Sequence, residues 1–580
     1  MKRIEYKKIF AICSLFMVWL FAIWKTRLGI HSDEVHSIAV GDMIANGNVY
    51  FKECWFYLQM SAVYTSPLIY LYETINGSTE GILYFFRILS VCIQTGIVLY
   101  FYFTFSKGFN KKYVAIAAIL LFVYVPDFQS FNYKQEMIWF SIMQIIFLYR
   151  YYKTGYKKYL IGLGIMIAGN VLSYPTTIIQ FPVFLGLIYK MEQLKGNKEK
   201  KVIKSWLLIT GVCAICASLF ILIVLKEISI EEFIEFFPVV FTDENLDSSF
   251  IAKLFHPLKK FILLGLMTWL PLIICEKINY IKRFIKRYQI PIVSIILWMA
   301  FLGQCYIERE GVTWHCITYP YSITLFLLPL LCKIKSNKGK EIFFLFEIPA
   351  IIAVLCIALA SNQGNITSMY GTIISLIGMV MLIGERNELR NKLTIEKEKK
   401  WIVISLLFMA LAIYGITVYE QESVEGGEQN TRTIWTPRTY VSNGPAKGMY
   451  LGEKIYSWYN DICAVTDKYV DVEDAVLIID NHKRTAFGYL NAKGDYATFS
   501  PQGGWGLDTS QRVEKYFKAN PHKMPTVVLI NLEYINMEIE KYLSESFPGV
   551  FLSKMGFQII DEEKGYIVLR QTKLSNYEIQ

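Results

Sequence analysis

Two adjacent carboxylates, Asp33 and Glu34, are the residues of this sequence best placed to do chemistry. They lie in the segment His31-Ser32-Asp33-Glu34, directly after the first long apolar stretch. A carboxylate at a membrane surface can act as a base that removes the proton of a hydroxyl group, and burial there would raise its pKa and its basicity. Acids in the first turn of a helix also complement the helix dipole, so a structural role is the alternative for this pair.

The elements that must position these acids are apolar stretches long enough to cross a membrane. The chain has 580 residues, of which 54% are hydrophobic, and this composition excludes an ordinary soluble enzyme. Stretches of roughly 17–22 residues span about 30 Å of hydrocarbon when they are helical. We predict about thirteen spans, at 8–26, 82–105, 113–127, 135–151, 158–174, 176–191, 206–225, 260–276, 290–307, 317–332, 342–360, 368–384 and 400–419.

The positive charges indicate how these spans are oriented. Lys and Arg concentrate in alternate connections, together with the basic N-terminus, which is the pattern of segments that stay in the cytoplasm. The N-terminus is therefore expected in the cytoplasm of a cell whose plasma membrane holds the chain. An odd number of spans then places residues 421–580 outside. This orientation accounts for the net charge of +10, so binding to nucleic acid need not be invoked.

The first outer loop, residues 27–81, contains the acids. Apolar residues recur with helical spacing from Asp33 to Ala45, behind Ser32 as a natural N-cap, and Asn46-Gly47 is a good helix stop. The segment from Lys52 to Tyr64 is rich in aromatic residues, as expected for a segment that lies in the headgroup layer. The loop is thus predicted to hold a helix at the membrane surface.

The last part of the chain, residues 421–580, has fewer apolar runs and more turns. Its pattern predicts helices at 450–468, 509–520 and 534–546, strands at 476–480 and 526–532, and a closing hairpin of 556–560 with 565–570. Alternation of strands and helices is typical of a small α/β domain. The chain is therefore predicted to be a polytopic α-helical membrane protein, residues 1–420, with an extracytoplasmic α/β domain. No phosphate-binding glycine motif appears, so no nucleotide is assigned.

The arrangement resembles the GT-C glycosyltransferases, integral-membrane enzymes that use polyprenyl-phosphate-linked sugars and include the protein O-mannosyltransferases and the aminoarabinose transferase. The matching features are a basic N-terminus, one helix and then the acids. They are followed by three short motifs and an outer soluble tail. The motifs are Ser66-Pro67-Leu68-Ile69-Tyr70, Gly81-Ile82-Leu83-Tyr84-Phe85-Phe86-Arg87 and Ser173-Tyr174-Pro175. The resemblance covers the first 190 residues, and the remainder matches in architecture.

This resemblance implies roles for individual residues. Asp33 would be the catalytic base and Glu34 its neighbour, orienting the acceptor or a cation. A phosphate leaving group needs stabilisation of its charge more than it needs a proton. The candidates for that task and for other contacts with substrate are Arg87, Lys134, Arg309, His315, the acid Glu136 and the aromatic Tyr64. Arg87 can instead pair with Glu80, and Asp127 competes with Glu136.

The reaction implied is the transfer of a sugar, with inversion, from a polyprenyl-phosphate donor to a cell-envelope glycan, lipid or protein on the outer face. Two alternatives are a flippase or transporter for lipid-linked glycans and a polymerase or ligase that uses them. A third is a surface-binding module for which the spans are only a scaffold. The adjacent carboxylates can also hold a divalent cation such as Mg²⁺ or Mn²⁺, although relatives of this kind do not all require a metal.

Overall fold

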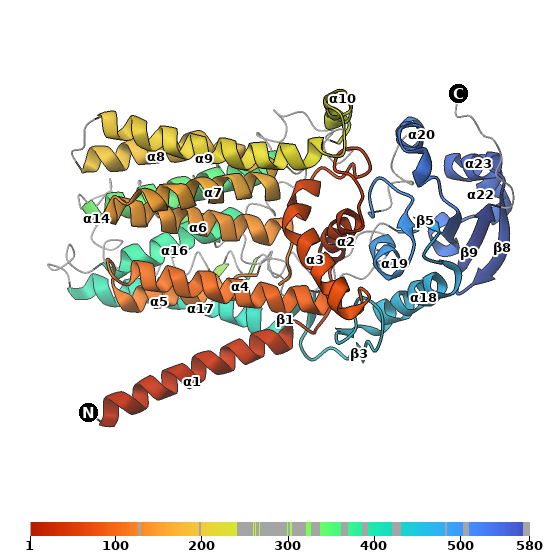
Figure 1. The fold of residues 1–580 in the computed structure, drawn as a ribbon. Helices are drawn as coiled ribbons and strands as arrows, with labels where there is room; N and C mark the ends of the chain where they lie inside the picture. The colour runs from red at the N-terminus through yellow and green to blue at the C-terminus, as the bar shows by residue number, and fades with distance from the viewer. Residues whose placement is uncertain are drawn as a thin grey trace.

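A bundle of long helices forms one part of the protein, and an α/β region lies at one end of it (Figure 1). The computed structural model describes residues 2–125, 129–195, 199–240, 337–360, 369–385, 393–419, 431–481, 484–502 and 510–571, with a few short pieces between 259 and 325. Three of the expected spans, 260–276, 290–307 and 317–332, lie almost entirely outside these residues.

The other expected spans coincide with helices of the bundle. The second span is helix α4, Ile82–Phe105, with the bounds that the apolar run predicts. The remaining bundle helices are α1 (Lys2–Lys25), α5 (Lys111–Val123), α6 (Tyr133–Thr154), α7 (Lys157–Ser173), α8 (Gln180–Leu194), α9 (Glu199–Leu225), α14 (Asn337–Ile342), α15 (Ile348–Ala360), α16 (Met369–Gly384) and α17 (Leu393–Ile416).

Three of the described helices are long and apolar enough to cross a membrane by length and composition, at Ile82–Phe105, Lys200–Leu225 and Lys338–Ala360. Shorter apolar helices lie at Leu15–Lys25, Gly371–Gly384 and Val403–Ile416. A π-helical turn, Phe343–Glu347, joins α14 to α15 within the third of the long helices. The described residues thus form a largely helical membrane protein, and they do not establish the full count of thirteen spans.

The first loop packs between the helical bundle and the α/β region. It holds α2 (Ser32–Ala45), a short 3₁₀ turn (Gln59–Ser61) and α3 (Ala62–Asn76), which lie across the end of the bundle (Figure 1). Helix α2 begins and ends close to the predicted residues, with Asn46 as its C-cap. Ten of its residues are buried, because one face packs on α3 and another meets the α/β region.

The α/β region is built around a five-stranded sheet in the order β6-β5-β7-β9-β8. Strands β5 (Ala475–Ile479), β6 (Asp495–Tyr496) and β7 (Val527–Asn531) are parallel, and β9 (Tyr566–Gln571) runs antiparallel to β7 and to β8 (Phe557–Glu563). Every residue of β5 and β7 is buried. This burial on both faces explains why these strands read as continuous apolar runs instead of alternating patterns.

The helices of the α/β region agree only in part with those predicted from the sequence. Helices α18 (Glu453–Tyr469) and α20 (Ser510–Ala519) match the prediction, whereas α19 (Thr485–Asn491) and β6 were not predicted. The helix expected at 534–546 is wrong as a single element, because two helices, α21 (Leu532–Ile535) and α22 (Ile539–Glu545), occupy this segment, and a third, α23 (Phe547–Lys554), follows it. Asn536, with a left-handed backbone, ends the first, and Pro548 lies in the first turn of the third.

Candidate active site

The N-terminus of α2 presents Asp33 at the end of the bundle that faces the α/β region. His31, not Ser32, caps this helix: its backbone is extended, and its Nδ1 accepts a hydrogen bond from the Asp33 amide at 3.0 Å. Ser32 already belongs to the first turn, so the predicted N-cap is wrong by one residue. The imidazole therefore lies against the backbone of Asp33, where it also affects the charge of the carboxylate.

Asp33 forms an ion pair with Lys134, which comes from a different part of the chain. The Lys134 Nζ lies 2.8 Å from the Asp33 Oδ2, and the side chains are 16% and 30% exposed. Lys134 lies in the first turn of α6, whose N-cap Asn132 accepts hydrogen bonds from the amides of Lys134 and Gln135. The pair thus joins the first loop to the N-terminus of a long bundle helix, where the helix dipole adds positive potential.

The pKa of Asp33 lies below its ordinary value. Burial alone raises this pKa, as the sequence predicts, but the positive charge of Lys134 and then the nearby His31 lower it by more. The hydrogen bond from Lys134 lowers it further. Asp33 is consequently a fully ionised carboxylate at neutral pH, and the expectation of a raised pKa is wrong for the site as it stands.

Glu34 points away from Asp33 and pairs with Arg87 of α4. The guanidinium is bidentate, with Nε to Oε1 and Nη2 to Oε2 both 2.6 Å, and the two side chains are 4% and 0% exposed. Nη1 donates to the carbonyl oxygens of Thr26 and Leu28, at 2.8 and 3.2 Å. Arg87 does not pair with Glu80, which instead pairs with Lys447 at 3.2 Å. Most N–H groups of Arg87 are thus used to hold α2, α4 and the end of α1 together.

Glu136 and Tyr64 both make hydrogen bonds to α7. Glu136 is buried in α6, and its Oε2 accepts a hydrogen bond from Ser173 Oγ of α7 at 2.7 Å. The Tyr64 hydroxyl donates to the carbonyl of Gly169, also in α7, at 2.9 Å. These two side chains are therefore brought near each other through α7. Arg309, His315 and Asp127 lie outside the described residues.

Tyr174 of the Ser173-Tyr174-Pro175 motif and several residues that the sequence reasoning did not single out complete the surroundings of the Asp33–Lys134 pair. The rings of Tyr133 and Tyr174 stack with centroids 6.1 Å apart, and the Lys134 Nζ lies 5.8 Å from the Tyr133 ring centroid. His36 lies one turn after Asp33 on α2. Its ring centroid is 4.3 Å from that of Phe56, and its Nε2 lies 3.5 Å from Ser500 Oγ. Helical spacing from Asp33 could have identified His36, whereas Ser500 requires the tertiary fold.

A metal site is not evident in the part of the chain that the structure describes. No group of three or more His, Cys, Asp or Glu side chains there is arranged to hold a metal ion. The carboxylates of Asp33 and Glu34, which would be the natural ligands, each face a different cation. In the described residues, the positive group beside Asp33 is therefore the side chain of Lys134.

Solved structures align with the chain over nearly its whole length. The archaeal oligosaccharyltransferase AglB from Archaeoglobus fulgidus, in complex with an inhibitory peptide and a dolichol-phosphate, matches at 13% identity with a TM-score of 0.46, over 98% of this chain and 75% of that chain. ArnT from Cupriavidus metallidurans matches over 99% of both chains. In the apo state its identity is 11% and its TM-score 0.42, and bound to undecaprenyl phosphate the values are 12% and 0.41.

No family model matches the sequence, and neither does any curated protein. AglB and ArnT both belong to the GT-C superfamily of glycosyltransferases. This is the superfamily that the arrangement of the sequence resembles. The chain is thus similar in overall structure to two GT-C glycosyltransferases.

Proposed function

We propose that this protein is an inverting membrane glycosyltransferase that uses a polyprenyl-phosphate-linked sugar. The acceptor is a hydroxyl group on a cell-envelope glycan, lipid or protein at the outer face of the plasma membrane. The observation that carries the proposal is the Asp33–Lys134 ion pair, in which a carboxylate and an ammonium group lie 2.8 Å apart at the end of the bundle helices. This combination is what sugar transfer from a lipid phosphate requires.

Lys134 supplies the charge that the leaving group needs. An ammonium group is a good partner for phosphate oxygens, and the dipole of α6 adds positive potential at its N-terminus, beside Lys134. Its side chain is only partly exposed and is flexible enough to turn from the Asp33 carboxylate to a phosphate. A donor that binds there is then held by its phosphate next to Asp33.

Asp33 serves as the base. Its pKa is lowered while Lys134 is its partner, so it is a weak base before the donor arrives. When Lys134 turns to the phosphate, the positive charge is shared, the effect of burial gains weight, and the basicity of Asp33 rises. The donor thus activates the base that it needs, and Asp33 does not take up a proton before the donor is bound.

The reaction itself balances without a further reagent. The acceptor oxygen attacks the anomeric carbon, its proton passes to Asp33, and the bond from the anomeric carbon to the phosphate oxygen breaks. The polyprenyl phosphate leaves with the electron pair of that bond, and Lys134 stabilises its charge. Attack from the side opposite to the leaving group inverts the configuration at the anomeric carbon.

The Glu34–Arg87 pair has a different role in this proposal. Because Arg87 is buried and its described contacts are with Glu34 and two backbone carbonyls, we assign it to positioning α2 and not to holding the phosphate. Glu34 in turn neutralises Arg87. Glu34 cannot move without breaking its buried ion pair with Arg87, and it therefore holds Asp33, its neighbour in the chain, in place.

The test is a transfer assay with the purified protein, a panel of polyprenyl-phosphate sugars and envelope extracts as acceptors. Asp33→Asn is expected to lower the rate by about 10²- to 10⁴-fold, the usual contribution of a general base. The matched control is Glu232→Gln, which removes an acid that pairs with Lys52 at 2.7 Å, against 2.8 Å for Asp33 and Lys134, but lies on α10 (Ile230–Val240). Unchanged transfer by Asp33→Asn would contradict the proposal. Movement of a labelled lipid-linked sugar across vesicle membranes without any transfer would replace the proposal by a flippase.

A further inference from the structure

The α/β region contacts α2 itself, through a buried hydrogen bond between Tyr496 and Asp42. The Tyr496 hydroxyl donates to the Asp42 Oδ2 at 2.5 Å, and both side chains are buried. Tyr496 ends strand β6, and its ring stacks on Tyr489 of α19 with centroids 4.9 Å apart. Asp42 lies on the last turns of the helix whose first turn carries Asp33.

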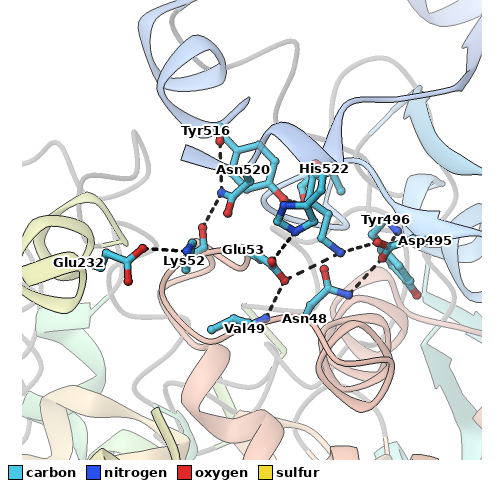
Figure 2. Close-up of polar contacts among 12 residues, drawn as sticks. Asn48, Val49, Lys52, Glu53, Glu232, Asp495, Tyr496, Tyr516, Asn520 and His522 are labelled. Atoms are coloured by element: carbon cyan, nitrogen blue, oxygen red, sulfur yellow. Dashed lines mark hydrogen bonds and ion pairs between the residues drawn. The ribbon is translucent and has the colours of Figure 1, made fainter. Parts of the chain in front are cut away.

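A second set of contacts fixes the chain that follows α2 (Figure 2). Asp495, the neighbour of Tyr496, accepts hydrogen bonds from Asn48 at 3.3 Å and from the buried Lys523 at 2.5 Å. His522 Nε2 lies 2.7 Å from Glu53 Oε1, and Glu53 Oε2 accepts a hydrogen bond from the Val49 amide at 2.9 Å. Asn520 donates to the Lys52 carbonyl at 2.9 Å.

Near the start of α2 the same region again makes contact. Ser500 Oγ lies 3.5 Å from His36 Nε2, and the Trp55 amide donates to the Phe499 carbonyl at 2.8 Å. The α/β region therefore holds α2 near both ends, while the Glu34–Arg87 pair holds it on the side of the bundle. No other described helix of the first loop has polar contacts of this kind on both sides.

We propose that Tyr496 is a positioning residue for sugar transfer, which through its hydrogen bond to Asp42 sets the place of α2 and so of Asp33. The inference rests on the proposed function, and it makes the α/β region a necessary part of the active site and not only a lid or an acceptor-binding module. The reacting atoms must be held to within a fraction of an ångström, and an error of about 1 Å can cost 100-fold in rate.

The charge of Asp42 adds a dependence on pH. Burial raises the pKa of Asp42 well above its ordinary value, and the carboxylate of Glu73 on α3 raises it further, against the opposite effect of Tyr496. Asp495, the neighbour of Tyr496 in the chain, pairs with Lys523 of the α/β region. As the pH rises through the raised pKa, Asp42 becomes ionised beside Glu73. The hydrogen bond from Tyr496 strengthens, but the two carboxylates repel each other, and this repulsion disturbs the packing of α2 on α3.

The α/β region offers a closely matched control for this hydrogen bond. The Tyr566 hydroxyl donates to the Asp480 Oδ2 at the same distance of 2.5 Å, and both residues are buried. This second pair lies between β9 and the end of β5, inside the sheet, so its loss weakens the region without touching α2. Tyr496→Phe and Tyr566→Phe therefore remove the same chemical group from the same region.

The experiment compares the two variants with the wild type, in full-length protein, by transfer kinetics and by hydrogen exchange of the α2 amides. Tyr496→Phe is expected to lower kcat by about 10- to 100-fold, to leave the KM for the donor within about twofold and to speed exchange across Ser32–Ala45. Tyr566→Phe is expected to keep kcat within about twofold of the wild type, with unchanged exchange in α2. Wild-type kcat and exchange in Tyr496→Phe would overturn the proposal, as would equal losses in both variants.

A further variant tests the part played by Asp42. Asp42→Asn carries a neutral group at every pH and still accepts the Tyr496 hydrogen bond, so its activity is expected to extend to more alkaline pH than that of the wild type. If the alkaline limb of the pH–rate profile is identical in Asp42→Asn and the wild type, the role given to Asp42 is contradicted. If the wild type transfers no sugar from any donor, the proposed function fails, whereas the exchange data still decide whether Tyr496 holds α2.

Discussion

Arg87 and Glu34 form a bidentate ion pair, with both nitrogen–oxygen distances 2.6 Å, between the head of helix α4 and the first turn of α2. The two residues are almost completely buried. Removing one partner from such a pair leaves an uncompensated charge, which costs more than removing both. The pair therefore acts as a fixed point for the residue next to it, Asp33.

This relationship predicts a characteristic pattern of stabilities. Arg87→Met is expected to lower the free energy of unfolding by about 3–5 kcal/mol, because Glu34 is left buried without its cation. The double variant Arg87→Met with Glu34→Met is expected to recover most of that loss. Thermal unfolding in detergent measures both. Losses that simply add in the double variant would show that the two side chains do not depend on each other.

The Asp33–Lys134 pair predicts how activity depends on pH. In Lys134→Met the cation that lowers the pKa of Asp33 is gone, so this pKa rises and the acid limb of the pH–rate profile moves to higher pH. The KM for the donor is expected to rise about 10-fold, since one charged hydrogen bond to phosphate is lost. Lys52→Met, which removes the ion pair of Lys52 with Glu232, is the control and should shift neither quantity. An acid limb that stays in place would contradict the electrostatic role of Lys134.

The same pair contributes to stability with a definite sign. Because the pKa of Asp33 is lower in the folded protein than in the unfolded chain, its contribution is present above the ordinary pKa and is lost as the pH falls through the lowered one. Asp33→Asn should therefore reduce the melting temperature at neutral pH more than at acid pH. Equal reductions at both would show that the pair does not stabilise the fold.

Gly41 marks where α2 and α3 come closest. A Cβ at this position would lie 2.4 Å from Thr65 Oγ1 and 2.8 Å from Ile69 Cδ1, and both side chains are buried. Gly41→Ala is expected to cost about 1–3 kcal/mol of stability through overpacking. Gly96→Ala is the control, since a Cβ there meets nothing within 4 Å. Equal thermal stability of the two variants would mean that the helices separate without penalty.

The polar contact between Glu53 and the α/β region predicts unequal roles for two neighbouring residues. His522 is 59% exposed and Lys523 only 5% exposed, although both approach Glu53. His522→Ala is expected to change the free energy of unfolding by at most about 1 kcal/mol, as for exposed pairs. Lys523→Met leaves Asp495 and the buried Glu53 without their shared cation and is expected to cost about 3 kcal/mol or more. Chemical denaturation with both variants measures the difference, and a larger effect of His522→Ala would contradict it.

Much of the helical architecture could be predicted from the sequence because hydrocarbon imposes a strict length and composition on each span. The apolar run at 82–105 gave both ends of α4, and the spacing of apolar residues gave α2. Strands β5 and β7 were equally accessible, as short apolar runs between turns. The pattern of apolar and turn residues that determines each of these elements lies within a short segment of the chain.

Contacts between distant parts of the chain were not accessible in this way. Arg87 has Glu80 nearby in sequence, yet it pairs with Glu34, because the buried position of the guanidinium requires an equally buried acid. The pKa of Asp33 was misjudged for the same reason: burial is visible in a hydropathy pattern, but the approach of Lys134 from α6 is not. Tyr496 and Asp42 likewise meet only in the tertiary fold.

Backbone hydrogen bonds between the first loop and residues 444–450 constrain how a newly made chain assembles. Gly29 donates to the carbonyl of Tyr450, the Tyr450 amide donates to Arg27, and the Gly81 amide donates to Gly444. Until the ribosome has completed these late residues, the segment that carries Asp33 lacks its hydrogen-bond partners, even though the early helices are already in the bilayer. Assembly of the first loop therefore requires synthesis of the chain at least as far as Tyr450, and termination before Tyr450 leaves the loop without these hydrogen bonds.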